Sequence, residues 1–429
     1  MFPRSSTALW RWVTSVVFAA MCAPLALPRR AAADPPAAAI RAADAARHVA
    51  ALADDTFEGR EGGTRGGRAA GAYVAEALRA AGLSPAGDGG TYFQRFGTMR
   101  NVLALVPGSD PVAGSEVVVV GAHYDHVGYG TSSNSNGPVG LIHNGADDNA
   151  SGVAGVLEIA ESLAALERRP RRGVVVAFWD GEEKGLLGSR HFLRDRPEPL
   201  RAMTPVFSLN LDMIGRLRER RVEVYGGRSA EGLRRMLVSA NRDVGLDLAF
   251  DWELLDDSDH FPFIEKGIPA LMLHTGLHGE YHRPDDDAHL VDATGIESVT
   301  RLALTTILAV ADDATAPRYR ADCRAEGKTL CEAIEREVPV DPSSPPPRWG
   351  MSTRRDAGDP AAPVVVRVVP GTPMAAAGLQ IRDRILAIDG IAVRDQDEML
   401  RRMEAAGDSV TVSVERRGRV VELPVHAAR

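Results

Sequence analysis

The sequence predicts an α/β fold, a doubly wound and mostly parallel sheet, followed by a smaller β-rich domain. Three observations support this prediction. The continuous apolar runs Val117–Ala122 and Val174–Trp179 are typical of strands that are buried on both faces. Segments with helical spacing, such as Ser151–Leu166, alternate with these runs, as expected of a parallel sheet covered by helices. A Pro/Ser-rich segment, D-P-S-S-P-P-P-R, separates the second, smaller unit.

The elements of the larger unit follow one another in a regular order. Helices are expected at Ala37–Asp54, Gly71–Ala81, Ser151–Leu166, Leu186–Arg194, Glu231–Val244 and Ala293–Asp312. Strands are expected at Val102–Val106, Val117–Ala122, Val174–Trp179, Val206–Leu211 and Pro269–His274. Between the first two helices, the glycine-rich segment Glu58–Arg68 follows no predicted strand, so we interpret it as a flexible loop near the mouth of a site.

Four segments are expected along the chain: residues 1–33, 34–315, 316–348 and 349–429. The last should contain strands at Val364–Val368, Ile385–Ile388, Val410–Glu415 and Val420–Val425, with helices at Met374–Ala377 and Asp397–Ala405. The third is a linker that carries Cys323 and Cys331. An even number of cysteines in an exported chain favours a disulfide, and a pair of free thiols is the alternative.

Composition and the N-terminus narrow the possible partners and location. The net charge of −8 argues against nucleic acid as a partner. Residues 1–33 have a basic start, an apolar run at Val13–Leu27 and small residues at Ala31–Ala33, which together indicate a secretory signal. An uncleaved anchor is the alternative. We therefore expect a periplasmic or secreted protein with no membrane span once the signal is removed.

Three polar clusters interrupt the apolar segments between Gly121 and Ser189. They are G-A-H-Y-D-H, N-G-A-D-D-N-A-S-G and W-D-G-E-E-K-G-L-L-G-S. Imidazoles and carboxylates at or just after strand ends are the donors that a zinc-like ion needs. The candidates with this placement are His123, Asp147, Glu183, Asp212 and His282. Three carboxylates among five ligands suit two ions better than one, with one carboxylate bridging.

The motifs H-Y-D, G-A-D-D-N-A-S-G, E-E-x-G-L-x-G-S, N-L-D-M and Y-H-x-P-D-D, taken together, resemble those of the co-catalytic di-zinc aminopeptidases. This family also contains relatives of glutamate carboxypeptidase and glutaminyl cyclase, and the resemblance covers about Leu52–Ala311. It implies a zinc-exopeptidase fold with two zinc ions. By this resemblance His123 and Asp212 bind one zinc, Glu183 and His282 bind the other, and Asp147 bridges the two.

The resemblance also assigns catalytic roles. Glu182 matches the general base of the family, and Asp125 matches the carboxylate that orients the first histidine. The chemistry agrees, since a carboxylate next to a ligand can reach a metal-activated water without occupying the metal. Asp125 lies two residues from His123, on the same side of an extended segment. Tyr281, beside His282, is a candidate donor to the tetrahedral oxyanion, with simple packing as the alternative.

Other polar residues in these motifs carry weaker expectations. Asp148 is expected to order its loop or cap the following helix, and His260 of S-D-H either supports a ligand or is structural. The acidic turn Asp285–Asp287 either holds the His282 loop or is solvated. The remaining histidines are not expected to bind metal, although His126 is a candidate for lining the pocket: His126, His143, His274, His278 and His289.

The smaller unit resembles a PDZ domain of the permuted bacterial kind. P-G-T-P-M-A-A-A-G-L followed by D-R-I-L-A-I-D-G carries this resemblance. It implies that a peptide adds as a strand and that its C-terminal carboxylate is held near Trp349–Ser352. The sequence departs from the pattern at Arg382, where glycine usually precedes Asp383. A purely structural appendage is therefore the alternative to ligand binding.

Together these observations predict an exported zinc exopeptidase that acts on peptides, most simply an aminopeptidase with a metal-bridging hydroxide and Glu182 as general base. A carboxypeptidase or a glutaminyl-cyclase-like enzyme on the same site is the first alternative, with Arg216 or Arg283 to grip a substrate carboxylate. The second is a non-catalytic peptide-binding protein that acts through the PDZ domain.

Overall fold

We describe a computed structural model of the chain, which covers residues 36–341, 343 and 347–427. The expected signal segment, residues 1–33, lies outside these described residues. From Pro36 onward the chain is one compact unit with two sheets.

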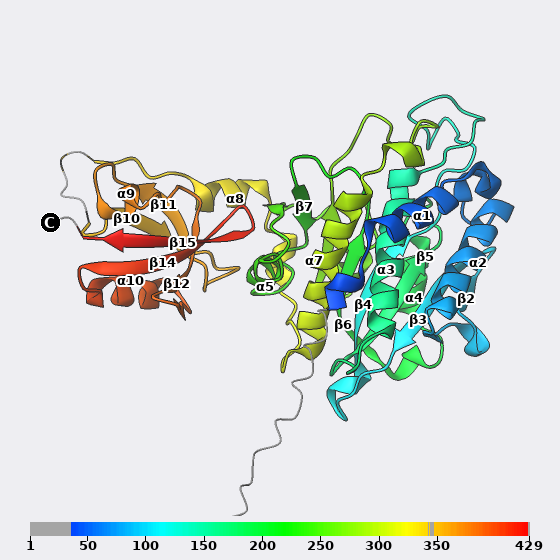
Figure 1. Ribbon diagram of the computed structural model, residues 1–429, viewed down its shortest axis with the longest axis horizontal. Helices are drawn as coiled ribbons and strands as arrows, with labels where there is room; N and C mark the ends of the chain where they lie inside the picture. Colours follow the sequence, from blue (N-terminus) through cyan, green and yellow to red (C-terminus); the bar gives the residue numbers. More distant parts are fainter. Residues whose placement is uncertain (1–35, 342, 344–346, 428–429) are drawn as a thin grey trace, which may run out of the picture. The chain divides into compact units, whose positions relative to one another are not determined.

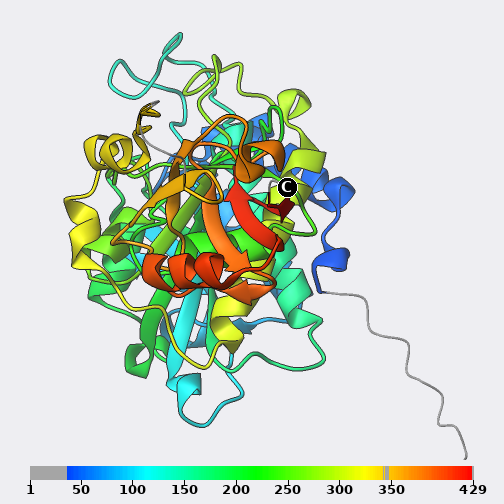
Figure 2. The same cartoon turned by 90° about the vertical axis from the view of Figure 1, so that its left-hand side faces the viewer.

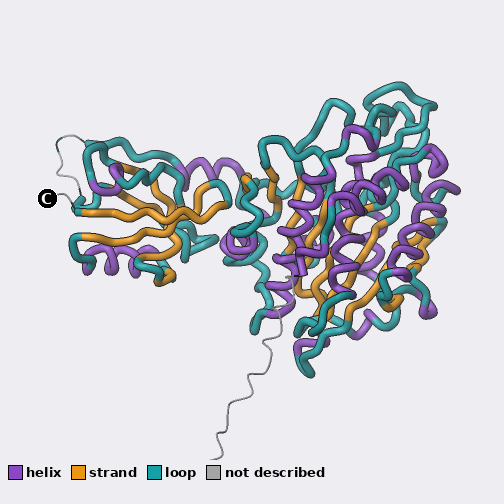
Figure 3. Tube along the Cα trace, in the orientation of Figure 1, coloured by secondary structure: helices purple, strands orange, loops and turns teal. Residues whose placement is uncertain are grey.

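The larger sheet has nine strands, which lie side by side in Figure 3. Its order is β1-β3-β5-β4-β6-β9-β7-β8, and β2 pairs with β3. The strands are β1 (Ser84–Pro85), β2 (Phe93–Phe96), β3 (Met99–Val106), β4 (Glu116–His123), β5 (Gly173–Trp179), β6 (Thr204–Leu211), β7 (Arg221–Tyr225), β8 (Asp247–Phe250) and β9 (Ala270–His274). The central strands β5, β4, β6 and β9 are parallel, whereas β3 and β7 join them antiparallel. The predicted α/β fold is confirmed, with a sheet that is mixed rather than mostly parallel.

Helices cover both faces of this sheet. Successive side chains of a strand point to opposite faces, so a strand of continuous apolar residues needs a covering layer on each face. Val118 and Val120 of β4 belong to the core under α1, α2, α3 and α7, while Val117 and Val119 belong to the core under α4 and α6. Figure 1 shows α1, α3 and α7 together on one side of the strands. The helices are α1 (Ala42–Leu52), α2 (Arg65–Ala80), α3 (Gly152–Ala164), α4 (Leu187–Arg194), α5 (Leu233–Ala240), α6 (Phe261–Glu265), α7 (Ala293–Asp312) and α8 (Lys328–Glu335).

Helix α7 matches its predicted bounds and is long and apolar enough to cross a membrane by composition alone. However, Ile296, Val299 and Ile307 on this helix are fully buried in the core against α1 and α3. Its apolar character is therefore that of a core helix.

The smaller sheet is antiparallel throughout, with the order β10-β11-β12-β14-β15 and with β13 paired to β12. Figure 2 shows its strands in orange and red. Its core includes Trp349 and Met399, so α10 packs against the sheet. The elements are β10 (Met351–Arg354), β11 (Val364–Val368), α9 (Pro373–Ala376), β12 (Arg384–Ile388), β13 (Ile391–Ala392), α10 (Gln396–Ala405), β14 (Ser409–Arg416) and β15 (Arg419–His426).

The disulfide expected in the linker is not present, because Cys323 and Cys331 are both free. Cys323 is buried in the core with Phe192 and Phe263, whereas Cys331 packs against a different cluster that contains Ile334 and Val364. The two thiols therefore take part in separate packing.

Candidate active site

The carboxyl ends of the central strands form the edge where the polar clusters meet. β4 ends at His123, Asp212 directly follows β6, and Glu182 lies three residues beyond the end of β5. The parallel register aligns these ends, since His123 is opposite Trp179 and Gly121 is opposite Asn210. Open α/β sheets bind ligands at this edge.

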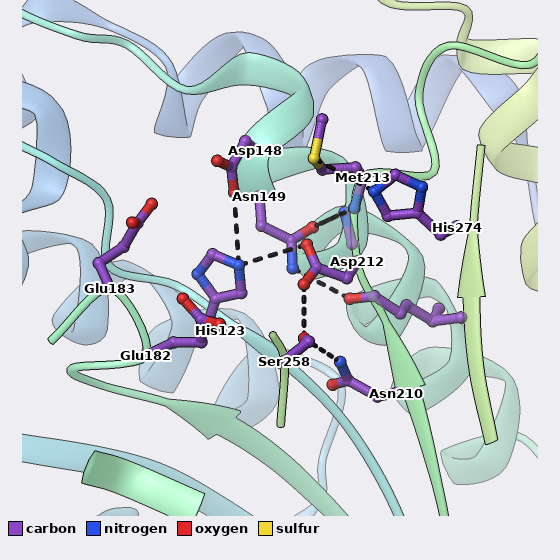
Figure 4. A network of polar contacts seen from close by, with 12 residues as sticks. His123, Asp148, Asn149, Glu182, Glu183, Asn210, Asp212, Met213, Ser258 and His274 are labelled. Carbon is purple, nitrogen blue, oxygen red and sulfur yellow. Dashed lines mark hydrogen bonds and ion pairs between the residues drawn. The ribbon is translucent and has the colours of Figure 1, made fainter. Parts of the chain in front are cut away.

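His123, Asp148 and Asp212 form one cluster, which we call the first donor group. Nε2 of His123 lies 3.3 Å from Oδ1 of Asp212 and 3.4 Å from Oδ1 of Asp148 (Figure 4). The hydroxyl of Ser258 donates a hydrogen bond of 2.5 Å to Oδ2 of Asp212, and the Asn210 amide donates to that hydroxyl. Asp212 is thus held in a fixed orientation, with Oδ1 turned towards His123.

His126, Asp148, Glu183 and His282 form the second donor group. Nε2 of His282 lies 3.1 Å from Oδ2 of Asp148 and 3.3 Å from Oε2 of Glu183. Nδ1 of His126 lies 2.9 Å from Oε1 of Glu183. The two groups share Asp148, whose two carboxylate oxygens face opposite ways.

The shared carboxylate is therefore not Asp147, which the sequence had suggested. Oδ1 of Asp147 accepts a hydrogen bond of 2.6 Å from the Gly215 amide, and Oδ2 lies 3.2 Å from His278, away from both donor groups. Adjacent residues in an irregular turn point to different sides, and the letters D-D do not show which one faces the site. Asp148, expected to order the loop, takes the central position instead.

The turn Ala146–Ser151 holds Asp148 in place by bonds from outside the turn. At Asp148 the backbone leaves the helical region (φ −105°, ψ 96°). Oδ2 of Asp286 accepts the amide hydrogens of Asp147 and Asp148, at 2.9 and 3.0 Å. The Asn149 side chain bonds the backbone of Leu211 and Met213 beside Asp212 (Figure 4). Of the acidic turn Asp285–Asp287, Asp286 thus supports the site.

Asp125 and Glu182 lie beside the first donor group. The backbone oxygen of Asp125 lies 3.1 Å from Nδ1 of His123, while its carboxylate lies 3.9 Å away. The backbone carbonyl therefore makes the closer contact with the imidazole. The carboxylate accepts the Glu182 amide hydrogen at 3.1 Å and so fixes the segment that carries Glu182.

Burial acts on every carboxyl of this region, and the neighbouring charges decide the direction of each pKa shift. Despite burial, His126 and His282 hold the pKa of Glu183 below its usual range. Burial raises the pKa of Glu182 well above its usual range, although His123 opposes the shift. Burial and the charge of Asp180 similarly raise the pKa of Asp125. Burial also raises the pKa of Asp259 to about 7. Carboxyl groups in such a setting gain strongly from nearby positive charge.

A cleft opens over the two donor groups. Besides members of the two donor groups, eight residues line this cleft: Glu182, Met213, Asp257, Ser258, Met272, His274, Leu277 and Tyr281. The Tyr281 ring stacks on His282 with ring centroids 4.0 Å apart. Burial, with the nearby charges of Asp148 and Glu183, raises the pKa of Tyr281 above its usual range, so its hydroxyl remains a donor at neutral pH.

The remaining histidines take structural places. His143 contacts Ser135 and Leu141, His274 faces the Met213 sulfur, and His278 contacts Asp147 and Glu280. His289 is exposed. His260 is fully buried, burial lowers its pKa to about 4, and Ser258 rather than His260 touches Asp212.

Arg60 is a site residue that the sequence analysis missed, within the segment interpreted as a flexible loop. Its guanidinium is buried and donates to the backbone oxygens of Tyr124, Leu52, Asn144 and Gly145, at 2.6 to 3.0 Å. It therefore ties the segment after His123 to the segment before Asp148. An arginine between glycines was the available signal, but only the fold shows what it binds.

The donor atoms fit a divalent metal ion of the zinc type. Two donors bound to one zinc ion at about 2.0–2.1 Å in tetrahedral geometry lie about 3.3 Å apart. The distances from the two imidazole Nε2 atoms to carboxylate oxygens, 3.1 to 3.4 Å, are close to this value. Imidazole nitrogen with carboxylate oxygen is also a donor set that suits zinc.

Two family models match the chain. Residues 101–307, which contain both donor groups, match the model for peptidase family M28, and residues 347–426 match a PDZ domain model. The chain combines an M28 peptidase domain with a PDZ domain. Both family resemblances that the motifs predicted are confirmed.

Known proteins show similarity to the M28 domain. Leupeptin-inactivating enzyme 1 of Streptomyces exfoliatus is 30% identical over 271 residues, 62% of this chain and 56% of that protein. The chain spans about half the length of the curated relatives it matches. The LapA aminopeptidase of Legionella pneumophila superposes with a TM-score of 0.54 at 16% identity, over 65% of this chain and 74% of that one. Glutaminyl cyclase of Porphyromonas gingivalis superposes with a TM-score of 0.51 at 23% identity, over 62% of this chain and 98% of that one. These two structures share the fold.

In the PDZ domain, β10 is an edge strand that pairs with β11. The Gln396 side chain of α10 donates to the backbone oxygen of Thr353 near its end. Arg382, which stands where the family usually has glycine, has a φ of 74°, a conformation that glycine adopts without strain. Peptide binding along β10 stays a prediction.

Proposed function

We propose that the chain is a zinc-dependent aminopeptidase that removes N-terminal residues from peptides. The observation that carries this proposal is the position of Asp148, which turns one oxygen to His123 and the other to His282. A carboxylate that joins two donor groups is the feature a two-ion site requires. In this proposal His123 and Asp212 would hold one ion, Glu183 and His282 would hold the other, and Asp148 would contribute an oxygen to each.

Two bound ions would polarise the scissile carbonyl and supply a nucleophilic water at neutral pH. The protein contributes a fixed set of donors in a buried setting. Ser258 orients Asp212, Asp286 orients the turn of Asp148, and Arg60 joins the two segments that bear His123 and Asp148. Preorganisation of this kind avoids reorganisation during the reaction.

Glu182 is the proposed general base. It lines the cleft beside the first donor group, and the Asp125 carboxylate holds its backbone amide. As a carboxylate beside a donor group, it is placed to accept the proton of the attacking water, which it then delivers to the leaving amine. The Tyr281 hydroxyl, which stays protonated, is placed in the same cleft to donate to the developing oxyanion.

The charge of the cleft favours an aminopeptidase over a carboxypeptidase. Outside the two donor groups, its described lining still contains the acids Glu182 and the exposed Asp257, and no lysine or arginine. Arg216, considered for a substrate carboxylate, is 3.2 Å from Asp286 and is largely buried there. An acidic cleft attracts a free ammonium group and repels a free carboxylate.

The substrate class is tested with matched pairs of substrates. We expect aminoacyl anilides and free dipeptides to be hydrolysed, while N-acetylated dipeptides with a free C-terminus are not. Treatment with a chelator should abolish turnover, and added Zn²⁺ should restore it. Hydrolysis of the N-blocked dipeptides alone would overturn the aminopeptidase assignment in favour of a carboxypeptidase. Absence of turnover on every substrate would favour the non-catalytic alternative.

The role of Glu182 is tested by Glu182→Gln. This change keeps the size of the side chain but removes the proton acceptor, so kcat should fall by about 10²–10⁴-fold. The metal content, measured by atomic absorption, should stay the same. Glu265→Gln, on the exposed face of α6, is the matched control and should keep wild-type kcat. Normal turnover by Glu182→Gln would show that another group is the base.

A further inference from the structure

His126 is a buried imidazole of the second donor group that the proposed mechanism does not use. Its Nδ1 atom lies 2.9 Å from Oε1 of Glu183 and 3.6 Å from Oδ2 of Asp148. Its ring meets that of His282 edge-on, with centroids 5.5 Å apart. The imidazole thus approaches the same two carboxylates as His282, from another side.

The surrounding backbone fixes this position. The His126 amide donates to the backbone oxygen of Arg60. The ring lies so close to Gly145 that a Cβ atom there would be 2.5 Å from Cδ2 of His126. Gly145, with a φ of 54°, therefore leaves the room that the imidazole occupies beside Asp148.

The distances within the second donor group are those of donors to a single ion. The contacts of His126 and His282 with Asp148 and Glu183 are 2.9, 3.1, 3.3 and 3.6 Å. They lie on both sides of the separation of about 3.3 Å for two donors on a tetrahedral zinc. His126 is therefore placed as well as His282 to contribute a nitrogen.

We propose that His126 is a fourth protein ligand of the second donor group. The inference rests on the proposed function, since it presumes an ion there. It makes the two groups unequal: the second has four protein donors and the first has three. Sites with four protein donors are typically closed and structural, whereas catalytic sites keep a position open. The second group should then bind its ion more tightly and fill first, and the first group is left with room for substrate.

The test is a titration of metal-free protein with Zn²⁺, followed by isothermal calorimetry and atomic absorption. Wild type should bind two ions in two steps of different affinity. His126→Gln should weaken the tighter step by at least about 100-fold, because removal of a direct ligand costs at least as much as loss of an outer partner. The weaker step should change little. Asp212→Asn, which alters the first donor group, should weaken the other step instead.

Loading with Co²⁺ separates a ligand from a neighbour that only orients Glu183. The visible bands of Co²⁺ depend on its coordination number, so one equivalent in His126→Gln should give a spectrum different from that of wild type. His143→Gln, another buried histidine, is the control and should leave the spectrum unchanged. Thermal melts of the metal-free variants confirm that each is folded, and His126→Asn provides a second substitution.

Two outcomes overturn the inference: unchanged affinity of the tighter step in a folded His126 variant, or an unchanged cobalt spectrum with weakened binding. Neither result contradicts the proposed function. That proposal fails separately if the wild-type protein binds no ion or hydrolyses no substrate with a free N-terminus.

Discussion

Two regions of this molecule contain buried carboxylates that are neutralised in different ways. At the candidate active site, the side-chain partners of Asp148 and Glu183 are imidazoles. In a second region, Asp356 receives two hydrogen bonds of 2.9 Å from Arg228 and one from Arg384. Glu415 receives a similar pair from Arg234. We call this second region the arginine cluster.

The electrostatic consequences differ in sign for Asp356 and for Glu182, the active-site carboxyl beside the first donor group. Burial would raise the pKa of Asp356, but Arg384 and Arg228 hold it below its usual range. In contrast, the pKa of Glu182 at the active site is raised by burial. The arginine cluster therefore carries its own positive charge. At the active site, burial disfavours the charged form of Glu182, and a nearby cation would offset this cost, which is the physical reason to expect cations there.

The largest expected effect comes from Asp148→Asn. This change removes the shared carboxylate, so binding of both ions should weaken by at least about 100-fold, with a matching loss of turnover. In the presence of a chelator, the variant should unfold at a lower temperature than wild type, because the imidazoles of His123, His126 and His282 lose a shared charged partner. Atomic absorption and thermal melts measure the two effects.

Asp147→Asn is the matched control. Asp147 contacts Gly215 and His278 rather than the donor groups, so this variant should keep both ions. If Asp147→Asn lost both ions while Asp148→Asn kept them, the sequence-based choice of bridging residue would be right after all.

A smaller effect is expected at the arginine cluster. Asp356→Ala leaves Arg384, which is 1% exposed, without its partner, and should lower the free energy of unfolding by about 3–5 kcal/mol. Turnover per folded molecule should be unchanged. Asp397→Asn breaks an exposed pair with Arg355 and should cost less than about 1 kcal/mol. Equal effects of the two changes in urea denaturation would refute the distinction between these sites.

The smallest effect concerns Glu158 on α3, a buried carboxyl that accepts a hydrogen bond of 3.0 Å from the backbone amide of Arg41 rather than from an arginine side chain. Burial raises its pKa to about 7, although the Arg41 amide opposes the shift. Between pH 4.5 and 7 the unfolded chain loses this proton while the folded chain keeps it. The free energy of unfolding therefore falls as pH rises through this range.

Glu158→Gln removes this dependence. We expect the variant to be more stable than wild type by about 1–3 kcal/mol at pH 8, with little difference at pH 4. The exposed Glu161→Gln on the same helix is the control. A gain that is the same at both pH values would show that ionisation of Glu158 is not its cause.

The sequence alone determined the fold class and the two domain families, and it named four members of the donor groups, His123, Glu183, Asp212 and His282. Apolar runs such as Val174–Trp179 must be buried strands, and α7 was predicted with its observed bounds, because periodicity is a local property. The short strands β7 and β8 were missed because, unlike the five-residue β9, they contain charged residues and are not continuous apolar runs. His123, Glu183, Asp212 and His282 could be found because they follow strand ends, which parallel strands bring to one edge.

Only the tertiary structure decided which carboxylate of D-D joins the two donor groups, that His126 faces Glu183, and that Arg60 is buried beneath the site. Each of these three features depends on the direction in which a side chain points from a segment of irregular backbone. That direction is set by contacts with distant segments, such as the bonds from Asp286 to the turn of Asp148. Spacing along the chain carries no information about such contacts.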